Sequence, residues 1–306
     1  MRGKRLGRAV LLTTIAAVAA SCGQDETPDR RALPDHTPFS RSGEAREERQ
    51  LTQAELDTLR SFKQRLRVTR DQYWDGRGGV FGNEWLTVWY PAGNLTPTHG
   101  MAVVDRVDRA RGQARLLFGR VPGEMLTIFC SESMESYGEE TGREWWQYSR
   151  IEGDKIVLQP VATIALRGLI EIVPAREYYE WTIGKLSARK APRWVAEGFA
   201  SLISGERDVV ESYVTEFPGD NTLLSLGDIE KELTREKDRK STRFAIFNAF
   251  RMVARLVDAH GDVALAGWIA DLGDGVSRDD AARKRFGKSW DEVVLEARAW
   301  SEEEPR

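Results

Sequence analysis

The segment A-P-R-W-V-A-E-G-F-A-S-L, residues 191–202, says more about the fold than any other part of this chain. Its pattern predicts an amphipathic helix over 192–204, with Pro192 in the first turn and Trp194 among the large side chains that face a core. Glu197 does not fit this explanation, because its carboxylate stands between apolar neighbours near the buried side. A buried carboxylate is costly unless a ligand or a partner accompanies it. The pattern therefore predicts a partner for Glu197.

The same segment resembles the P-x-W-hydrophobic-x-E-G-hydrophobic-A helix of the peptidase MA-like gluzincins, which are zinc metallopeptidases of broadly thermolysin-like kind. In that family the glutamate that matches Glu197 is the third zinc ligand, and Trp194 and Gly198 match other positions of the motif. Weaker likenesses follow the family's order along the chain, at residues 84–91, 243–262 and 275–291. The resemblance covers roughly residues 84 to 300 and implies a gluzincin-like fold.

An active gluzincin also needs H-E-x-x-H on the preceding helix, because histidines four residues apart share a helix face and bind one zinc ion while the glutamate activates its water. The segment expected to form that helix is T-I-A-L-R-G-L-I-E-I-V, residues 163–173, which has no histidine. One register puts Arg167 and Glu171 at the histidine positions, and a register one residue later puts a glycine and an isoleucine there. Pro174 would break or bend the helix directly afterwards.

The loss of these ligands predicts a pseudo-metallopeptidase with no metal, no other cofactor and no catalytic residue. Such a domain would keep a cleft that binds a peptide or protein, because a fold without its site does not carry the activity. Two alternatives stay open: an active hydrolase with a different constellation in the same cleft, and a purely structural lipoprotein. The chain has three histidines, His36, His99 and His260, and nothing gives them the spacing of zinc ligands.

If Glu197 projects into a vacated zinc site, it needs a cation. Arg167 is one candidate, because a guanidinium can make two parallel hydrogen bonds to a carboxylate, and it would bridge Glu197 and Glu171. The alternative is that Glu197 pairs with Arg193, four residues earlier on its own helix. The sequence does not decide between these two arrangements.

The beginning of the chain has the layout of a signal peptide. Residues 1–8 carry four positive charges, and residues 9–20 are apolar or small throughout. Twelve helical residues rise only about 18 Å, short of the roughly 30 Å of a bilayer core. The following A-A-S-C, residues 19–22, resembles the lipobox of bacterial lipoproteins, which implies cleavage after residue 21, a lipid on Cys22 and attachment to a membrane of the cell envelope. In such lipoproteins an aspartate directly after the cysteine favours retention at the inner membrane. This chain has Gly23 there, so the outer membrane is favoured if the source organism has two membranes.

Charge and cysteine content exclude some classes of function. Removal of residues 1–21 takes away four positive charges and no negative one, so the formal net charge goes from −3 to −7. An acidic protein binds nucleic acid poorly, so no nucleic-acid partner is expected. Cys130 then remains as the single unlipidated cysteine, in an apolar run that predicts a packed thiol.

The composition divides the mature chain into a tether and one domain. Residues 22–49 are rich in charge and proline and poor in large apolar side chains, which predicts a disordered tether. The domain is expected over 50–302, with a sheet lobe at about 70–160 and a helical lobe at about 161–302, an α+β fold. Strands are expected at 84–90, 125–130 and 155–159, and helices at 52–68, 98–114, 161–173, 192–204, 242–259, 262–272, 278–286 and 289–301.

Two glutamates lie between the expected helices at 161–173 and 192–204. Glu177 and Glu180 are expected on a solvated face, with Arg176 reaching Glu180 at the i,i+4 spacing of a helix. They are not expected to take part in a site.

Overall fold

The computed structural model describes residues 78–91, 97–213 and 223–299. All of them belong to one compact unit, which spans Glu47–Arg306. The expected signal peptide, Cys22, the tether at 22–49 and the helix at 52–68 lie outside the described residues.

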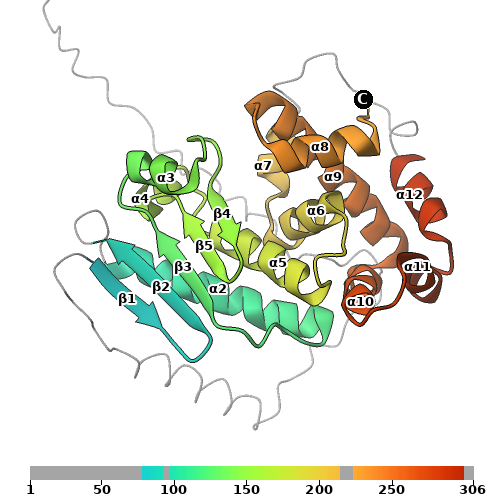
Figure 1. Cartoon of the computed structure of the whole chain (residues 1–306), viewed down its shortest axis with the longest axis horizontal. Helices are drawn as coiled ribbons and strands as arrows, with labels where there is room; N and C mark the ends of the chain where they lie inside the picture. Colours follow the sequence, from blue (N-terminus) through green and yellow to red (C-terminus); the bar gives the residue numbers. More distant parts are fainter. Residues whose placement is uncertain (1–77, 92–96, 214–222, 300–306) are drawn as a thin grey trace, which may run out of the picture. The chain divides into compact units, whose positions relative to one another are not determined.

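The sheet has five strands in the order β1-β2-β3-β5-β4 (Figure 1). The three inner strands run parallel, and the two outer strands pair with them in antiparallel fashion. Helix α2, Pro97–Phe118, connects β2 to β3 and packs on β1 and β2. The strands are β1 Gly78–Gly82, β2 Leu86–Pro91, β3 Leu126–Cys130, β4 Ser149–Glu152 and β5 Lys155–Leu158. The three expected strands and the helix packed on them are confirmed, whereas β1 and β4 were not expected.

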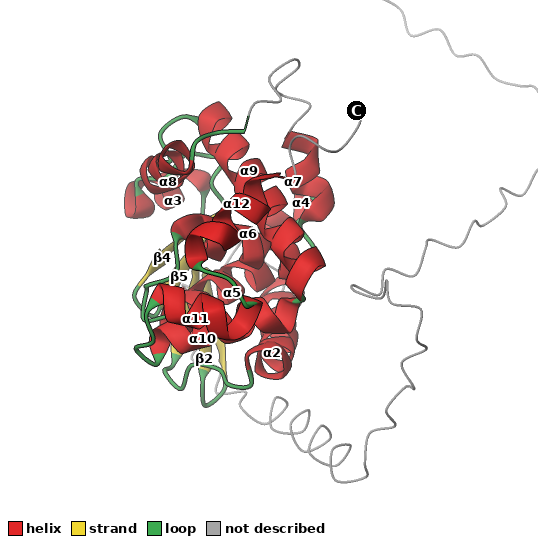
Figure 2. Ribbon diagram, turned by 90° about the vertical axis from the view of Figure 1, so that its right-hand side faces the viewer, coloured by secondary structure: helices red, strands yellow, loops and turns green. Residues whose placement is uncertain are grey.

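Helix α3, Met134–Thr141, lies between β3 and β4. After β5, the described part of the chain is helical. Its helices are α4 Val161–Leu166, α5 Val173–Leu186, α6 Arg193–Ser204, α7 Arg207–Ser212, α8 Leu226–Arg235, α9 Arg239–His260, α10 Asp262–Gly273, α11 Arg278–Phe286 and α12 Trp290–Ala299. Helices α6 to α12 lie to the right of the sheet in Figure 1, and Figure 2, seen from that side, shows α10 and α11 in front of strand β2. The expected α+β class, with the sheet first and the helices after it, is confirmed. No described helix combines the length and apolar composition needed to cross a bilayer.

The single helix expected over 161–173 is wrong. Helix α4 ends at Leu166, and Gly168 then adopts a φ of 72°, a left-handed conformation that glycine tolerates best. A new helix, α5, begins at Val173 with Pro174 in its first turn, where the missing N–H of proline costs nothing. Pro174 therefore starts a helix rather than breaking one.

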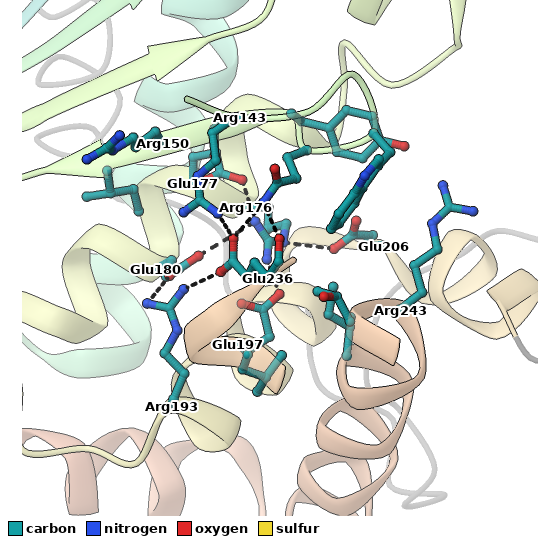
Figure 3. A pocket seen from close by; sticks show the side chains of 18 of the residues that line it. Arg143, Arg150, Arg176, Glu177, Glu180, Arg193, Glu197, Glu206, Glu236 and Arg243 are labelled. Atoms are coloured by element: carbon teal, nitrogen blue, oxygen red, sulfur yellow. Dashed lines mark hydrogen bonds and ion pairs between the residues drawn. The ribbon is translucent and has the colours of Figure 1, made fainter. Parts of the chain in front are cut away.

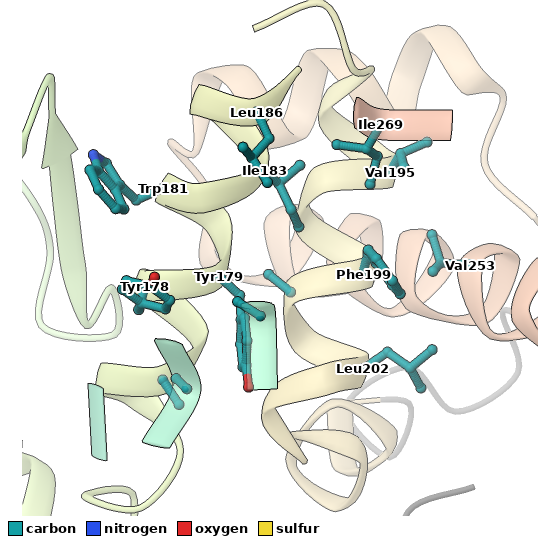
Figure 4. Packing of buried hydrophobic residues seen from close by; sticks show 14 of the residues in the cluster. Tyr178, Tyr179, Trp181, Ile183, Leu186, Val195, Phe199, Leu202, Val253 and Ile269 are labelled. Carbon is teal, nitrogen blue, oxygen red and sulfur yellow. The ribbon is translucent and has the colours of Figure 1, made fainter. Parts of the chain in front are cut away.

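Helix α5 is the helix that packs against α6, and it also contacts α2 and β4. Figure 4 shows α5 and α6 side by side, with Tyr179 and Ile183 of α5 and Val195 and Phe199 of α6 in the packed layer. These four side chains are at most 2% exposed. Arg176 lies beside this layer, on the side of α5 that also meets α6, where it is ion-paired with Glu197.

Two residues of the 191–202 segment, Gly198 and Trp194, have packing roles. A Cβ at Gly198 would lie 2.4 Å from the carbonyl oxygen of Ala249, so glycine allows α6 to approach the backbone of α9. Trp194 is buried and stacks on Trp290 of α12, with ring centroids 6.0 Å apart. Both residues fix α6, and with it the position of Glu197.

Candidate functional site

The candidate site lies where the polar face of α5 meets α6, and its centre is the guanidinium of Arg176 (Figure 3). Arg176 is ion-paired with Glu177 and Glu197, and its Nε lies 3.1 Å from Glu206 Oε2. A fourth carboxylate, Glu180, lies 3.6 Å from the guanidinium. One arginine therefore holds together two carboxylates from α5, one from α6 and one from the turn before α7.

These groups are withdrawn from solvent. The side chains of Glu177, Glu197 and Glu206 are 2 to 4% exposed, and that of Arg176 is 12% exposed. Glu206 also accepts a hydrogen bond of 2.8 Å from Ser201. Because buried charges are stable only when they are paired and hydrogen-bonded, each of these groups depends on the others.

A second layer of ion pairs closes the cluster on its outer side. Arg193 lies 3.4 Å from Glu180 and 2.9 Å from Glu236, and Arg143 also pairs with Glu236. Glu236 ends helix α8 in a left-handed conformation, with a φ of 46°, which is uncommon for a residue other than glycine. The carboxylate of Glu236 thus links α8 to the cluster through two arginines.

The pKa values of the cluster follow from burial and charge. Burial opposes the charge on Arg176, but the surrounding carboxylates outweigh it and hold the pKa of Arg176 well above its ordinary value. Burial raises the pKa of Glu177 to about 7, with Arg176 opposing the rise and Glu180 adding to it. Burial also raises the pKa of Glu206. Burial, with a smaller contribution from the negative charges of Glu180 and Glu197, therefore favours a proton on Glu177 near neutral pH.

The cluster borders an inner cavity of about 120 Å³. Aromatic side chains, Trp146, Tyr148 and Tyr213, form part of its wall. Thr242 also lines the cavity, is 2% exposed, and its hydroxyl has no hydrogen-bond partner among the described residues. The cavity has room for a few water molecules rather than for a peptide.

Glu197 has the buried position and the cation that the sequence predicted, but the cation is a different one. Arg167 lies elsewhere, where its Nη1 donates hydrogen bonds to the carbonyl of Trp145 and to Gln159 Oε1. Glu171 pairs with Arg106, and its side chain is 57% exposed. The expected bridge from Arg167 to Glu197 and Glu171 is therefore wrong, because the segment that carries Arg167 and Glu171 is not the helix that packs on α6.

The alternative partner for Glu197 is wrong as well, since Arg193 pairs with Glu180 and Glu236. The solvated face expected for Glu177 and Glu180 is also wrong: the side chains are 2% and 13% exposed. The i,i+4 pair of Arg176 with Glu180 does form.

A spacing in the sequence could have identified the cluster. Residues 176–180 read R-E-Y-Y-E, which keeps the spacing of H-E-x-x-H with arginine and glutamate at the two histidine positions. Glu177 then takes the position of the general base, and Glu197 follows on the next helix of the pair. The aromatic residues between the charges mark the face of α5 that the core covers.

These residues do not fit a zinc ion. Zinc sites in proteins use thiolate, imidazole and carboxylate ligands, and this cluster has neither a cysteine nor a histidine. The permanently charged guanidinium of Arg176 also pairs with the carboxylates that a metal ion would need as ligands. Among residues 78–91, 97–213 and 223–299, no three His, Cys, Asp or Glu side chains are arranged to hold a metal ion.

The two described histidines and Cys130 lie outside the cluster around Arg176. His260 contacts Glu296 of α12 at 2.9 Å and packs beside Phe286, so it ties together the end of α9 and the last two helices. His99 lies in the first turn of α2. Cys130 is buried, as expected, and burial raises the pKa of its thiol to about 12, which makes it unreactive at neutral pH.

Comparison with solved structures finds similarity to crystal structures of an M1 zinc metallopeptidase from Deinococcus radiodurans. The enzyme itself gives a TM-score of 0.46 at 17% identity, and a single-residue variant gives 0.45 at 16%. The same variant bound to a Tyr-Ser-Ala substrate gives 0.44 at 15%. Each alignment covers 72% of this chain and 49% of the peptidase chain, so this chain spans about half the length of these enzymes. No family model matches the chain, and no curated protein matches it.

Proposed function

We propose that this chain is a lipid-anchored protein of the bacterial cell envelope whose gluzincin-like domain is not catalytic and binds a peptide or protein. The observation that carries the proposal is the buried guanidinium of Arg176, ion-paired with Glu177 and Glu197. The R-E-x-x-E spacing on α5 and the glutamate on α6 match the three ligand positions and the base position of a gluzincin. An internal cation in that place offsets part of the charge of the carboxylates and occupies the space of a metal ion.

The anchor rests on the sequence of the first 22 residues. The basic start, the short apolar run and the A-A-S-C sequence support cleavage before Cys22 and lipid attachment to it. A protein held in this way would present its domain at a membrane surface, where the domain could bind a peptide or protein without catalysing a reaction.

The experiment is metal analysis of the full chain, purified in detergent, together with a peptidase assay on a mixture of unlabelled peptides. The proposal predicts less than one tenth of a zinc ion per chain and no cleavage above that of a blank preparation. One tightly held zinc ion per chain with hydrolysis that a chelator stops would overturn it.

A second candidate function is an active hydrolase with a non-standard site, and the state of Glu177 favours it. A buried carboxyl with a pKa of about 7 suits general acid or base catalysis at neutral pH. Its test is the Glu177→Gln variant: cleavage that the wild type shows and this variant lacks would support the hydrolase. Serine and threonine hydroxyls near Glu177 supply no histidine-activated nucleophile, so the first proposal is preferred.

A further inference from the structure

A second hollow, of about 480 Å³, opens next to the inner cavity. We name it the aromatic groove, and its main walls are Trp145, Tyr148, Arg167, Val209, Tyr213 and Arg243. The groove shares Trp146, Tyr148, Tyr213 and Arg243 with the wall of the inner cavity. A molecule in the groove would thus lie against the outside of the cluster around Arg176.

The groove combines exposed aromatic surface with stacked cations. Trp145 is 52% exposed, a large fraction for a tryptophan. The guanidinium of Arg167 lies 5.7 Å from the centroid of Trp145 and 5.9 Å from that of Tyr148. The guanidinium of Arg239 lies 5.0 Å from the Trp145 ring. Contact with aromatic rings holds a guanidinium in place without neutralising its charge.

Charge distinguishes the groove from the inner cluster. Arg176, Arg193 and Arg143 are each paired with glutamates. Arg167, in contrast, has no carboxylate within ion-pair distance among the described residues, and its hydrogen-bond acceptors are a backbone carbonyl and a neutral amide. Arg167 is exposed, and the one carboxylate among the described residues that line the groove, that of the exposed Asp208, is not within ion-pair distance of it. The surface around Arg167 and Trp145 is therefore complementary to an anion that also offers apolar area.

We infer that the aromatic groove binds an extended peptide segment in which an acidic side chain stands next to an aromatic or aliphatic one. The carboxylate would meet Arg167, and the apolar side chain would cover Trp145. A neutral sugar fits less well, because it has no anionic group to meet Arg167. The inference rests on the proposed function and gives the chemistry of its ligand.

The test is fluorescence anisotropy with three labelled peptides and the full chain in detergent. The peptides are capped at both ends and alternate phenylalanine with glutamate, with glutamine or with lysine. The glutamate peptide is expected to bind at least tenfold more tightly than the glutamine peptide, and to weaken as salt rises because exposed charges are screened. Equal affinity for these two peptides, or no binding of any of the three, overturns the inference.

Variants of Arg167 test whether the glutamate peptide binds in the groove. Arg167→Met is expected to lower the affinity for the glutamate peptide at least tenfold, whereas Arg167→Lys, which keeps the charge, is expected to retain most of it. The matched control is Arg120→Met, which removes an exposed arginine paired with Asp274 outside the groove. Thermal unfolding of each variant separates loss of binding from loss of folding, and unchanged affinity in folded Arg167→Met contradicts the inference.

Two further outcomes keep the proposals separate. If sulfated dextran competes with the glutamate peptide at equal charge concentration and shows the same loss in Arg167→Met, the groove binds polyanions in general and the peptide assignment is wrong. If the glutamate and glutamine peptides bind equally and stay intact, the acidic preference fails while the non-catalytic function stands. Cleavage of any of the peptides would instead overturn the proposed function.

Discussion

At the scale of single residues, Arg176 decides what the site can do. Four carboxylates converge on it, and burial would make each of them costly without a cation. A zinc ion can exchange ligands and polarise a bound water, whereas a guanidinium is a fixed charge whose N–H groups are used by its partners. The same carboxylates that would serve a metal are thereby committed to holding the structure together.

A double-mutant cycle on Arg176→Met and Glu197→Gln is expected to give a coupling free energy of about 2 kcal/mol or more in denaturant unfolding. Arg176→Met leaves the buried Glu197 without its cation, and removing one partner of a buried ion pair typically costs about 3–5 kcal/mol. The matched control is the cycle on Arg167→Met and Glu197→Gln, which should couple by less than about 0.5 kcal/mol because these residues are not in contact. Similar coupling in the two cycles would contradict the placement of Arg176.

The pKa of Glu177 predicts a pH dependence of stability. Its folded-state pKa is raised from 4.5 to about 7, so the folded protein holds a proton that the unfolded chain releases. The contribution of Glu177 to stability is therefore complete below about pH 4.5 and is lost as the pH rises through 7. The groups that face Glu177 are Arg176, Glu180, Glu197 and Ser149.

Glu177→Gln removes this titration. The free energy of unfolding of the variant minus that of the wild type should therefore be larger at pH 8 than at pH 5, by at least about 1 kcal/mol. Urea unfolding at the two pH values measures the difference. As a control, Glu171→Gln changes an exposed carboxylate and should show no such difference. A larger gain for Glu177→Gln at pH 5 than at pH 8 would show that the sign is wrong.

At the scale of elements, the site depends on helix α6, which packs against α5 and also against α9. Helix α5 carries Arg176, Glu177 and Glu180, and α6 carries Glu197. Helix α9 fixes α6 from the other side, at the place where Gly198 meets the backbone of Ala249. Because the aromatic layer between α5 and α6 is fully packed, a small shift of either helix would separate the charges.

Gly198→Ala is expected to lower the free energy of unfolding by at least about 1 kcal/mol, even though alanine favours helix more than glycine does, because the new Cβ would overlap the α9 backbone. Gly112→Ala is the matched control. It lies exposed in α2 with nothing within 4 Å of an added Cβ, so the change should leave stability equal or raise it by about 0.5–1 kcal/mol. Chemical denaturation compares the two, and equal effects would rule out the close contact.

The sequence predicted the elements whose periodicity is strong, and failed where a local signal had two meanings. The inner strands, α2, α6 and the last four helices were predicted with small errors at their ends. Helix α5 was missed because Pro174 suggests a break, although proline equally begins a helix. This error moved the expected partner helix to residues 163–173 and the expected cation to Arg167.

The candidate site was predicted in its logic rather than in its members. A carboxylate inside an apolar helix face demands a cation, and a cation does lie beside Glu197, but both arginines named from the sequence, Arg167 and Arg193, were wrong. The R-E-Y-Y-E spacing at 176–180 could have identified Arg176, but it was missed because the partner helix was expected at 163–173. Charged residues such as Glu177 and Glu180 look solvated in sequence because burial of a charge is uncommon without a network of partners.

At the scale of the whole molecule, the proposed lipid on Cys22 would set where the domain works. Metabolic labelling with a fatty acid should label the wild type and not Cys22→Ala, and only the wild type should remain in the membrane fraction. Cys130→Ala is the control, because that buried thiol is not expected to carry lipid. A Cys22→Ala protein that still takes up label and stays with the membrane would contradict the anchor.

The central claim is that Arg176 and Glu180 stand where a gluzincin has its two histidines, with Glu197 as the third position. The most direct test is the zinc content per chain of the Arg176→His/Glu180→His variant beside wild type, with folding checked by thermal unfolding. The account predicts that the wild type retains no stoichiometric zinc, that the folded variant retains one zinc ion, and that adding Glu197→Gln releases it. A stoichiometric zinc ion in the wild type, or a folded variant that takes up none or holds it without Glu197, would contradict the account.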